Sequence, residues 1–239
     1  MSNFDLLIRN GTVATAADTF QADVAIKDGR VVALGHDLGT AEQEIDAAGK
    51  LLLPGGIEGH CHIEQISSSR VMTADDFYSG TVSAVFGGTT TVIPFAAQQK
   101  GDSLRQTVED YHACAGPKAV IDYGFHLIIS DPSDQVIGQE LPALIKDGYT
   151  SFKVYMTYDD LRLDDYQMLE VLSAARRDGA MVMVHAENHD MIRWLSEKLL
   201  DAGHWQPQYH AISHSSRSWW CMSRRKRRWM KSAWPRIRA

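Results

Sequence analysis

Short apolar runs alternate with longer stretches of helical pattern between residues 56 and 203, and this rhythm restricts the possible folds more than any other feature. Strands separated by helices of this length predict parallel βαβ units. Helix-start patterns at Thr73 and Asp164 support the division. The expected strands are Ile57–Ile63, Thr89–Ala96, Ile121–Ile129, Thr150–Met156 and Met181–His185, and the expected helices span about 75–87, 102–115, 133–147, 164–178 and 188–203.

These five βα units are compatible with two α/β architectures. The first is a partial (β/α)8 TIM barrel, of which a closed version needs eight units, and residues 204–239 do not supply three more. The second is an open, doubly wound sheet. A partial barrel leaves two unpaired strand edges, so we expect a chain with this fold to aggregate.

Residues 1–55 predict a small β module in front of the βα units. The apolar run Phe4–Arg9 ends at Asn10-Gly11, which is typical of a turn. The runs 23–27 and 30–34 flank Asp28-Gly29 and predict a hairpin. The short run 50–53 before Pro54 predicts one more strand.

The segment Gly59-His60-Cys61-His62 is the first candidate site. Side chains alternate along a strand, so both imidazoles should lie on one face and Cys61 on the other. Two neighbouring imidazoles suit a borderline cation such as Zn²⁺. Two polar histidines at a strand end, without any metal, explain the pattern equally well.

Lys153 lies inside the apolar run 151–156 and is the second candidate. A lysine there is costly unless it is paired, neutralised or modified. A neutral amine can react with carbon dioxide to form a carbamate, whose two oxygens can bridge two metal ions. The more common explanation of such a lysine is a side chain that reaches out to the rim of the barrel.

His185 ends the apolar run 181–185 and is the third candidate. A lone histidine at a strand end is more often structural than a metal ligand. Here it falls at the same end of its strand as the histidine pair and Lys153 do on theirs. The carboxyl ends of parallel strands are where the active sites of barrels form.

Together these segments resemble the cyclic amidohydrolases, most closely the dihydropyrimidinase and D-hydantoinase group. The resemblance runs from about Asp5 to about Ser213 and rests on the order and spacing of four motifs. They are His60-Cys-His62, Gly87-Gly-Thr-Thr-Thr91, Ser151-Phe-Lys-Val-Tyr-Met156 and Val184-His-Ala-Glu-Asn188. Glu58 departs from the family, which often has aspartate there.

The resemblance implies a binuclear metal site of two divalent ions, most simply Zn²⁺, although Mn²⁺ or Co²⁺ would suit the same ligands. His60 and His62 would bind the first ion, His185 the second, and carboxylated Lys153 would bridge them. Tyr158 would hydrogen-bond the substrate carbonyl. The implied substrate is a small cyclic amide or imide, such as 5,6-dihydrouracil or a 5-substituted hydantoin, opened to an N-carbamoyl amino acid.

The resemblance also implies two ligands without a matching position here, a histidine on the sixth strand and an aspartate on the eighth. We therefore expect the chain as written to be inactive or nearly so. The alternative function is a non-catalytic, metal-binding remnant.

Residues 204–239 are expected to form an aberrant basic, tryptophan-rich tail outside the native fold, after a module at 1–55 and a barrel part at 56–203. Residues 213–239 hold seven Arg, two Lys, four of the six Trp and no acidic residue, within a chain of net charge -6. An abrupt change of this kind indicates a shift of reading frame. The alternative is a genuine basic tail that binds nucleic acid or an anionic membrane surface.

Composition restricts the setting of the protein. No apolar run approaches the roughly 20 residues that span a membrane, and the first residues show no secretory pattern. Three widely spaced cysteines argue against a disulfide framework and favour a reducing cytoplasm. We expect no nucleic-acid or membrane partner, and the family implies a homotetramer for full-length relatives.

Overall fold

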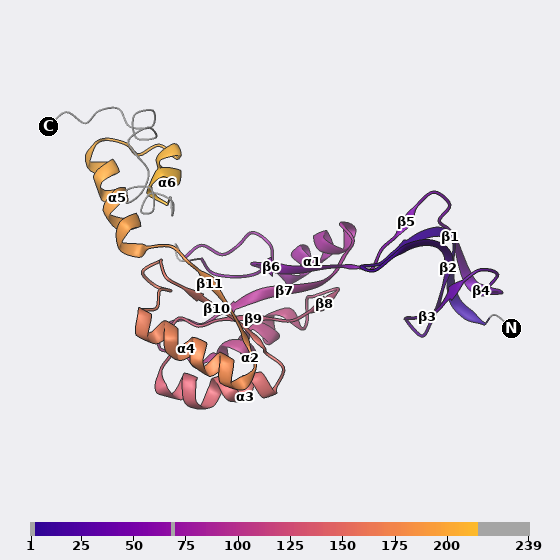
Figure 1. The fold of residues 1–239 in the computed structure, drawn as a ribbon, viewed down its shortest axis with the longest axis horizontal. Helices are drawn as coiled ribbons and strands as arrows, with labels where there is room; N and C mark the ends of the chain where they lie inside the picture. The colour runs from indigo at the N-terminus through magenta and orange to yellow at the C-terminus, as the bar shows by residue number, and fades with distance from the viewer. Residues whose placement is uncertain (1–2, 68–69, 215–239) are drawn as a thin grey trace. The chain divides into compact units, whose positions relative to one another are not determined.

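The computed structural model describes residues 3–67 and 70–214. The part of the expected tail 204–239 that begins at residue 215 lies outside them. The chain divides into two compact units. The first comprises the residues up to Ile57 together with Gly88–Thr90, and the second comprises the rest. Each unit contains one β-sheet, drawn in Figure 1.

The first sheet is formed by strands that lie between Phe4 and Leu52. Its strands are β1 (Phe4–Ala14), β2 (Thr19–Lys27), β3 (Arg30–Gly35), β4 (Ala41–Asp46) and β5 (Leu51–Leu52). The order is β3-β2-β1-β4, and β5 also pairs with β1. The predicted hairpin is confirmed, since β2 and β3 are antiparallel and Asp28 and Gly29 have φ of 51° and 70° at its turn.

The predicted turn at Asn10-Gly11 is wrong, because β1 continues through it. The pairing of β1 with β2 shifts register between Ile8 and Gly11, and Asn10 has a φ of 60°. The backbone amide of Asn10 donates to the carboxylate of Asp23 at 2.9 Å, so the irregularity leaves this donor satisfied. A Cβ on Gly11 would lie 2.4 Å from Cδ1 of Leu52, so a larger residue here would require the Leu52 side chain to move. The pair of residues therefore forms a bulge.

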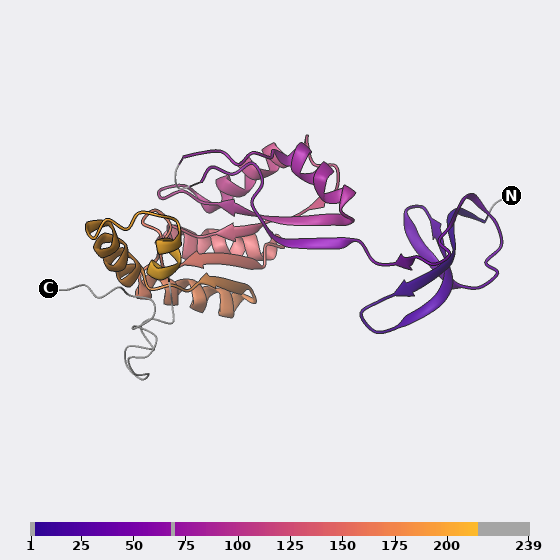
Figure 2. The same ribbon diagram turned by 90° about the horizontal axis from the view of Figure 1, so that it is seen from above.

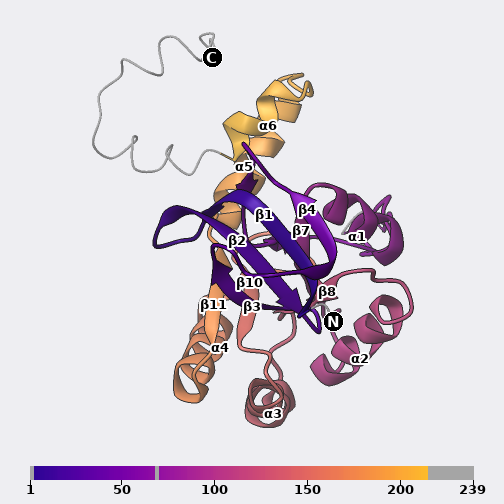
Figure 3. The same ribbon diagram turned by 90° about the vertical axis from the view of Figure 1, so that its right-hand side faces the viewer.

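The second sheet is a curved, largely parallel sheet, and it confirms the α/β class and the partial TIM barrel. Its order is β11-β10-β9-β7-β6, and β8 pairs with β7. Figure 3 shows helices α1 to α4 in an arc around these strands. The strands are β6 (Gly56–Cys61), β7 (Thr89–Ala97), β8 (Asp122–Tyr123), β9 (His126–Ile128), β10 (Ser151–Tyr155) and β11 (Met181–His185).

The predicted strand Ile121–Ile129 is interrupted. It forms the separate strands β8 and β9, with Gly124 and Phe125 between them. The backbone amide of Gly124 donates to the Val92 carbonyl at 3.0 Å. Both short strands are parallel to β7, so the interruption leaves the order of the sheet unchanged.

The helices largely follow the predicted ranges. They are α1 (Phe77–Phe86), α2 (Leu104–Ala115), one π-helical turn (Val136–Glu140) followed by α3 (Leu141–Lys146), α4 (Asp165–Asp178), α5 (His189–Asp201) and α6 (Gln208–Ser213). Figures 1 and 2 show α5 and α6 beyond the ends of the strands, where they pack against each other. The sequence did not predict α6. No helix of the described residues combines the length and the apolar character needed to cross a membrane.

Two helix starts show how local sequence determines the boundaries. Asp164 caps α4 as predicted, accepting from the amide of Gln167 at 2.8 Å in a capping box. The predicted capping box at Thr73 is wrong, because α1 begins after Asp76, which forms the box with Ser79. The hydroxyl of Thr73 instead accepts from the backbone amide of Gln65 at 3.0 Å.

The main core lies between the second sheet and the helices. It consists of aliphatic and aromatic side chains from both layers, with Phe77, Leu104, Leu127, Leu141, Phe152 and Val171 fully buried. This packing fixes β10 from its outer face. Its inner face, which carries Lys153 and Tyr155, is therefore held in place for chemistry.

Candidate metal centre

All five predicted site residues line one cavity of about 620 Å³. His60 lies on β6 and His62 directly follows that strand, while Lys153 lies on β10 and His185 ends β11. Tyr158 follows β10 in the connecting loop. Residues more than 120 positions apart in the sequence therefore meet because their parallel strands end at the same edge of the sheet.

The histidine pair has the alternation that the sequence predicts. The ring centroids of His60 and His62 are 6.1 Å apart, and the Phe95 ring lies 4.9 Å from the first and 5.0 Å from the second. Cys61 lies on the opposite side and packs against the main core. Burial raises the pKa of its thiol to about 11, with the charge of Glu58 adding to the effect. A neutral thiol directed toward the core leaves the two imidazoles as the candidate ligands of this strand.

Lys153 is buried, with 7% of its surface exposed. Its register partners are Ile128 on β9 and Met183 on β11. The Nζ atom lies 5.4 Å from the centroid of the Tyr155 ring and 6.0 Å from that of Phe95. Burial lowers the pKa of this amine. The lowered pKa enlarges the neutral fraction, which is the form that reacts with carbon dioxide.

His185 is held by one aromatic and one acidic neighbour. It is the register partner of Tyr155, and the two rings stack with centroids 5.6 Å apart. Its Nε2 lies 2.7 Å from a carboxylate oxygen of Glu187. An ionised carboxylate only accepts hydrogen bonds, so Nε2 carries the proton and Nδ1 keeps its lone pair for a metal.

Backbone hydrogen bonds fix the position of Tyr158 in the loop after β10. It has a φ of 73°, and its carbonyl accepts from the amides of Leu161 and Arg162 at 3.0 and 2.8 Å. The ring centroid lies 5.2 Å from that of His185. Burial raises the pKa of the phenol, and the charge of Glu187 raises it further. The hydroxyl is therefore a hydrogen-bond donor at neutral pH.

Sequence reasoning missed three residues of the site, namely Phe95, Gln65 and Glu187. Phe95 supports both histidine rings and appears in the sequence only as one more apolar residue of β7. Gln65 and Glu187 each contact one imidazole, and each lies two or three positions after its histidine. Such short spacing after a histidine at a strand end is the signal that could have found them.

Glu58, which departs from the family pattern, has a local role. Its carboxylate accepts from the backbone amide of His60 at 2.8 Å. The longer arm of glutamate relative to aspartate is thus folded back onto the strand that carries the histidine pair. With glutamate at this position, both imidazoles still line the cavity.

The donor set fits divalent metal ions only when Lys153 is included. Within residues 3–67 and 70–214, no group of three His, Cys, Asp or Glu side chains could hold a metal ion. The cavity is lined by three imidazoles, the carboxylate of Asp160 and one amine of lowered pKa. Converting that amine to a carbamate would add two oxygens that share one negative charge, and Zn²⁺ accepts such oxygen ligands beside imidazole.

Comparison with known proteins shows which family the chain belongs to. The model of the amidohydrolase family matches residues 51–213, about two thirds of the chain. The chain belongs to the amidohydrolase family. This amidohydrolase is 48% identical over 210 residues to a D-hydantoinase of Geobacillus stearothermophilus, covering 87% of this chain and 44% of that protein. It is 41% identical over 215 residues to a dihydropyrimidinase of Rattus norvegicus, covering 87% of this chain and 41% of that protein.

Solved structures give the same result for the fold. A D-hydantoinase structure superposes with a TM-score of 0.86 at 45% identity, covering 90% of this amidohydrolase and 47% of that chain. The dihydropyrimidinase from Brevibacillus agri superposes with a TM-score of 0.83 at 44% identity, covering 87% and 45%. The chain therefore spans less than half the length of these relatives.

Proposed function

We propose that this chain carries most of the metal site of a hydrolase that opens small cyclic amides or imides, as its hydantoinase and dihydropyrimidinase relatives are named for doing. The observation that carries the proposal is the meeting of His60, His62, Lys153 and His185 in one cavity. The substrate class is either a 5-substituted hydantoin or 5,6-dihydrouracil, opened to the N-carbamoyl amino acid.

The proposed ligand roles follow the family pattern. His60 and His62 would hold one ion, His185 would hold the other, and carboxylated Lys153 would serve as a ligand to both. Two divalent ions, most simply Zn²⁺, supply Lewis-acid polarisation of the amide carbonyl and activation of water when bound. Mn²⁺ and Co²⁺ suit the same nitrogen and oxygen ligands.

The chain's own residues position the substrate. The protonated hydroxyl of Tyr158 donates to the substrate carbonyl and to the negative charge that develops on its oxygen, as an oxyanion-hole donor does. Phe95 packs against both histidine rings and supports them. Glu187 keeps the proton of His185 on Nε2.

We propose further that the chain as written turns over slowly or not at all. The resemblance implies that full-length members of this group supply a histidine from the sixth strand and an aspartate from the eighth, and neither has a matching position in this sequence. From the resemblance to this group we also propose a homotetramer for the full-length protein and a cytoplasmic setting.

Two purified proteins test the proposal. The chain alone, purified with Zn²⁺ and bicarbonate, is assayed with hydantoin and with dihydrouracil, and we expect no measurable ring opening. Residues 1–213 are also joined to the C-terminal half of the Geobacillus D-hydantoinase, and we expect this chimera to open at least one of the two rings. A Zn²⁺-loaded chimera that opens neither would contradict the substrate class, and ordinary turnover by the chain alone would contradict the need for further ligands.

A further inference from the structure

The side chain of Gln65 forms a hydrogen bond with one ring nitrogen of His62. Its Oε1 lies 2.5 Å from Nδ1 of His62, three positions earlier in the chain. Gln65 has 8% of its surface exposed, so water competes little for this contact. A carbonyl oxygen accepts and cannot donate, so Nδ1 must carry the imidazole proton. That leaves the Nε2 lone pair of His62 as the only ring donor for a metal.

The amide of Gln65 is oriented by a second partner. The phenol of Tyr111 on α2 is a further hydrogen-bonding neighbour of the Gln65 side chain, and burial is the main effect that raises the pKa of this phenol. Only the NH₂ group of a glutamine can donate to an oxygen. Because Oε1 is the atom that faces His62, the NH₂ group remains for this second partner.

The backbone of Gln65 is pinned on both sides. Its amide donates to the Thr73 hydroxyl at 3.0 Å, and its carbonyl accepts from the Thr73 amide at 3.0 Å. Thr73 and Gln65 therefore close the loop between β6 and α1. These two hydrogen bonds fix the backbone from which the Gln65 side chain reaches His62.

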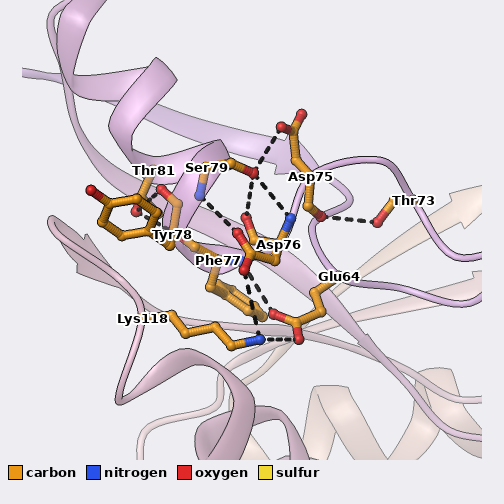
Figure 4. Close-up of polar contacts among 9 residues, drawn as sticks. All are labelled: Glu64, Thr73, Asp75, Asp76, Phe77, Tyr78, Ser79, Thr81 and Lys118. Carbon is orange, nitrogen blue, oxygen red and sulfur yellow. Dashed lines mark hydrogen bonds and ion pairs between the residues drawn. The ribbon is translucent and has the colours of Figure 1, made fainter.

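Glu64, the residue before Gln65, anchors the loop to the start of α1, as Figure 4 shows. It has a φ of 48°, an uncommon conformation for glutamate. One carboxylate oxygen accepts from the backbone amide of Phe77 at 3.1 Å, and the other pairs with Lys118. These contacts hold the turn that points Gln65 at His62.

From these contacts we infer that Gln65 is a positioning residue for the metal centre, which fixes His62 as the Nδ1-protonated tautomer and presents Nε2 to a divalent cation. The inference rests on the metal-binding role proposed for His62. A hydrogen bond to the second ring nitrogen of a histidine ligand orients the ring and raises its basicity, and losing such a partner typically lowers metal affinity by about 10- to 100-fold.

The metal-free chain gives the first test. Nitrogen-15 NMR of histidine-labelled protein, with the His62 signal assigned by its loss in His62→Asn, reports which ring nitrogen carries the proton. We expect protonated Nδ1 in the wild type and in Gln65→Glu, which keeps an acceptor oxygen. We expect a mixture of tautomers in Gln65→Met. Protonated Nε2 in the wild type would overturn the inference without using any variant.

Zinc affinity, measured by competition with a chromophoric chelator in the presence of bicarbonate, gives the second test. We expect Gln65→Met to bind Zn²⁺ about 10- to 100-fold more weakly, and Gln65→Glu to restore most of the loss. Gln106→Met, the same change at an exposed position of α2, should have wild-type affinity. Equal affinity in Gln65→Met and wild type would also overturn the inference. Because both measurements are independent of turnover, failure of the proposed hydrolysis leaves them interpretable.

Discussion

The Nζ atom of Lys153 lies 5.4 Å from the centroid of the Tyr155 ring, two residues further along β10. No carboxylate forms an ion pair with this lysine among residues 3–67 and 70–214. A buried, unpaired cation disfavours folding, which is why burial lowers the pKa of the amine. The same isolation makes the neutral amine available for carboxylation.

Replacing Lys153 with methionine should therefore stabilise the metal-free chain, although it removes the amine that is proposed to bind metal. We expect Lys153→Met to raise the free energy of unfolding of the metal-free chain by about 1 kcal/mol, since burying an unpaired polar group costs about 1–3 kcal/mol in proteins. Chemical denaturation measures this change. Lys146→Met, at an exposed position of α3, is the control and should change stability much less. A large loss of stability in Lys153→Met would show that the amine has a stabilising partner.

Carboxylation itself has a direct signal. With ¹³C-labelled bicarbonate and Zn²⁺, we expect a carbamate resonance in the ¹³C spectrum of the wild type. The resonance should be absent from Lys153→Met and should persist in Lys146→Met. A carbamate signal that survives in Lys153→Met would place the modification on another amine.

Cys61 should be nearly inert toward thiol reagents in the folded chain. Its pKa of about 11 leaves only about one part in a thousand as thiolate at pH 8, and the thiolate is the reactive form. Cys114 is exposed and provides the internal comparison. We expect labelling at pH 8 to modify Cys114 rapidly and Cys61 only after unfolding, as followed by peptide mass spectrometry. Equal rates at the two cysteines would contradict the packing of Cys61 in the core.

Asp76 should make the stability of the chain depend on pH. The backbone amide of Ser79 donates to its carboxylate and lowers the pKa below the usual 3.8. A lowered pKa means that this stabilisation is complete above the unfolded-state value and is lost as the pH falls through the folded-state value. We expect Asp76→Ala to be less stable than the wild type at pH 7 and the difference to shrink below about pH 4. Asp76→Ser keeps a cap without a charge, so the difference in stability between Asp76→Ser and Asp76→Ala should not change with pH in this window.

Tyr158 should contribute to substrate binding and not to metal binding. Loss of one hydrogen bond costs about 0.5–1.5 kcal/mol, or roughly 2- to 10-fold in affinity. We expect Tyr158→Phe to bind hydantoin weaker by that factor in the Zn²⁺-loaded chain while its zinc affinity is unchanged. Calorimetric titration measures both, and Tyr166→Phe on the exposed side of α4 is the matched control. Unchanged hydantoin affinity in Tyr158→Phe would remove the tyrosine from the proposed site.

The sequence predicted the second sheet well because its strands are short apolar runs between amphipathic helices. Met181–His185 was predicted without error, and the alternation at His60, Cys61 and His62 followed from the period of two along a strand. The first sheet was less accessible. The strand Ala41–Asp46 is polar and mostly exposed, so its pairing with β1, and not its composition, makes it a strand.

Only those site residues whose type and position in the sequence already indicate their chemistry could be predicted. Histidines at strand ends and a lysine in an apolar run are visible in the sequence. The contacts that orient them are not, because Gln65 acts through a loop closed by Thr73 and by the anchor of Glu64 on α1. The capping box at Thr73 failed for the same reason, since the threonine hydroxyl is already used by the loop.

Zinc content is the most direct test of the metal centre. The chain is dialysed against Zn²⁺ and bicarbonate, then against metal-free buffer, and its zinc is measured by mass spectrometry beside a His60→Asn/His62→Asn double variant and Lys153→Met. We expect the wild type to retain at least one ion per chain and both variants to retain far less. Equal zinc in the wild type and in the double variant would contradict the assignment of this cavity as a metal centre.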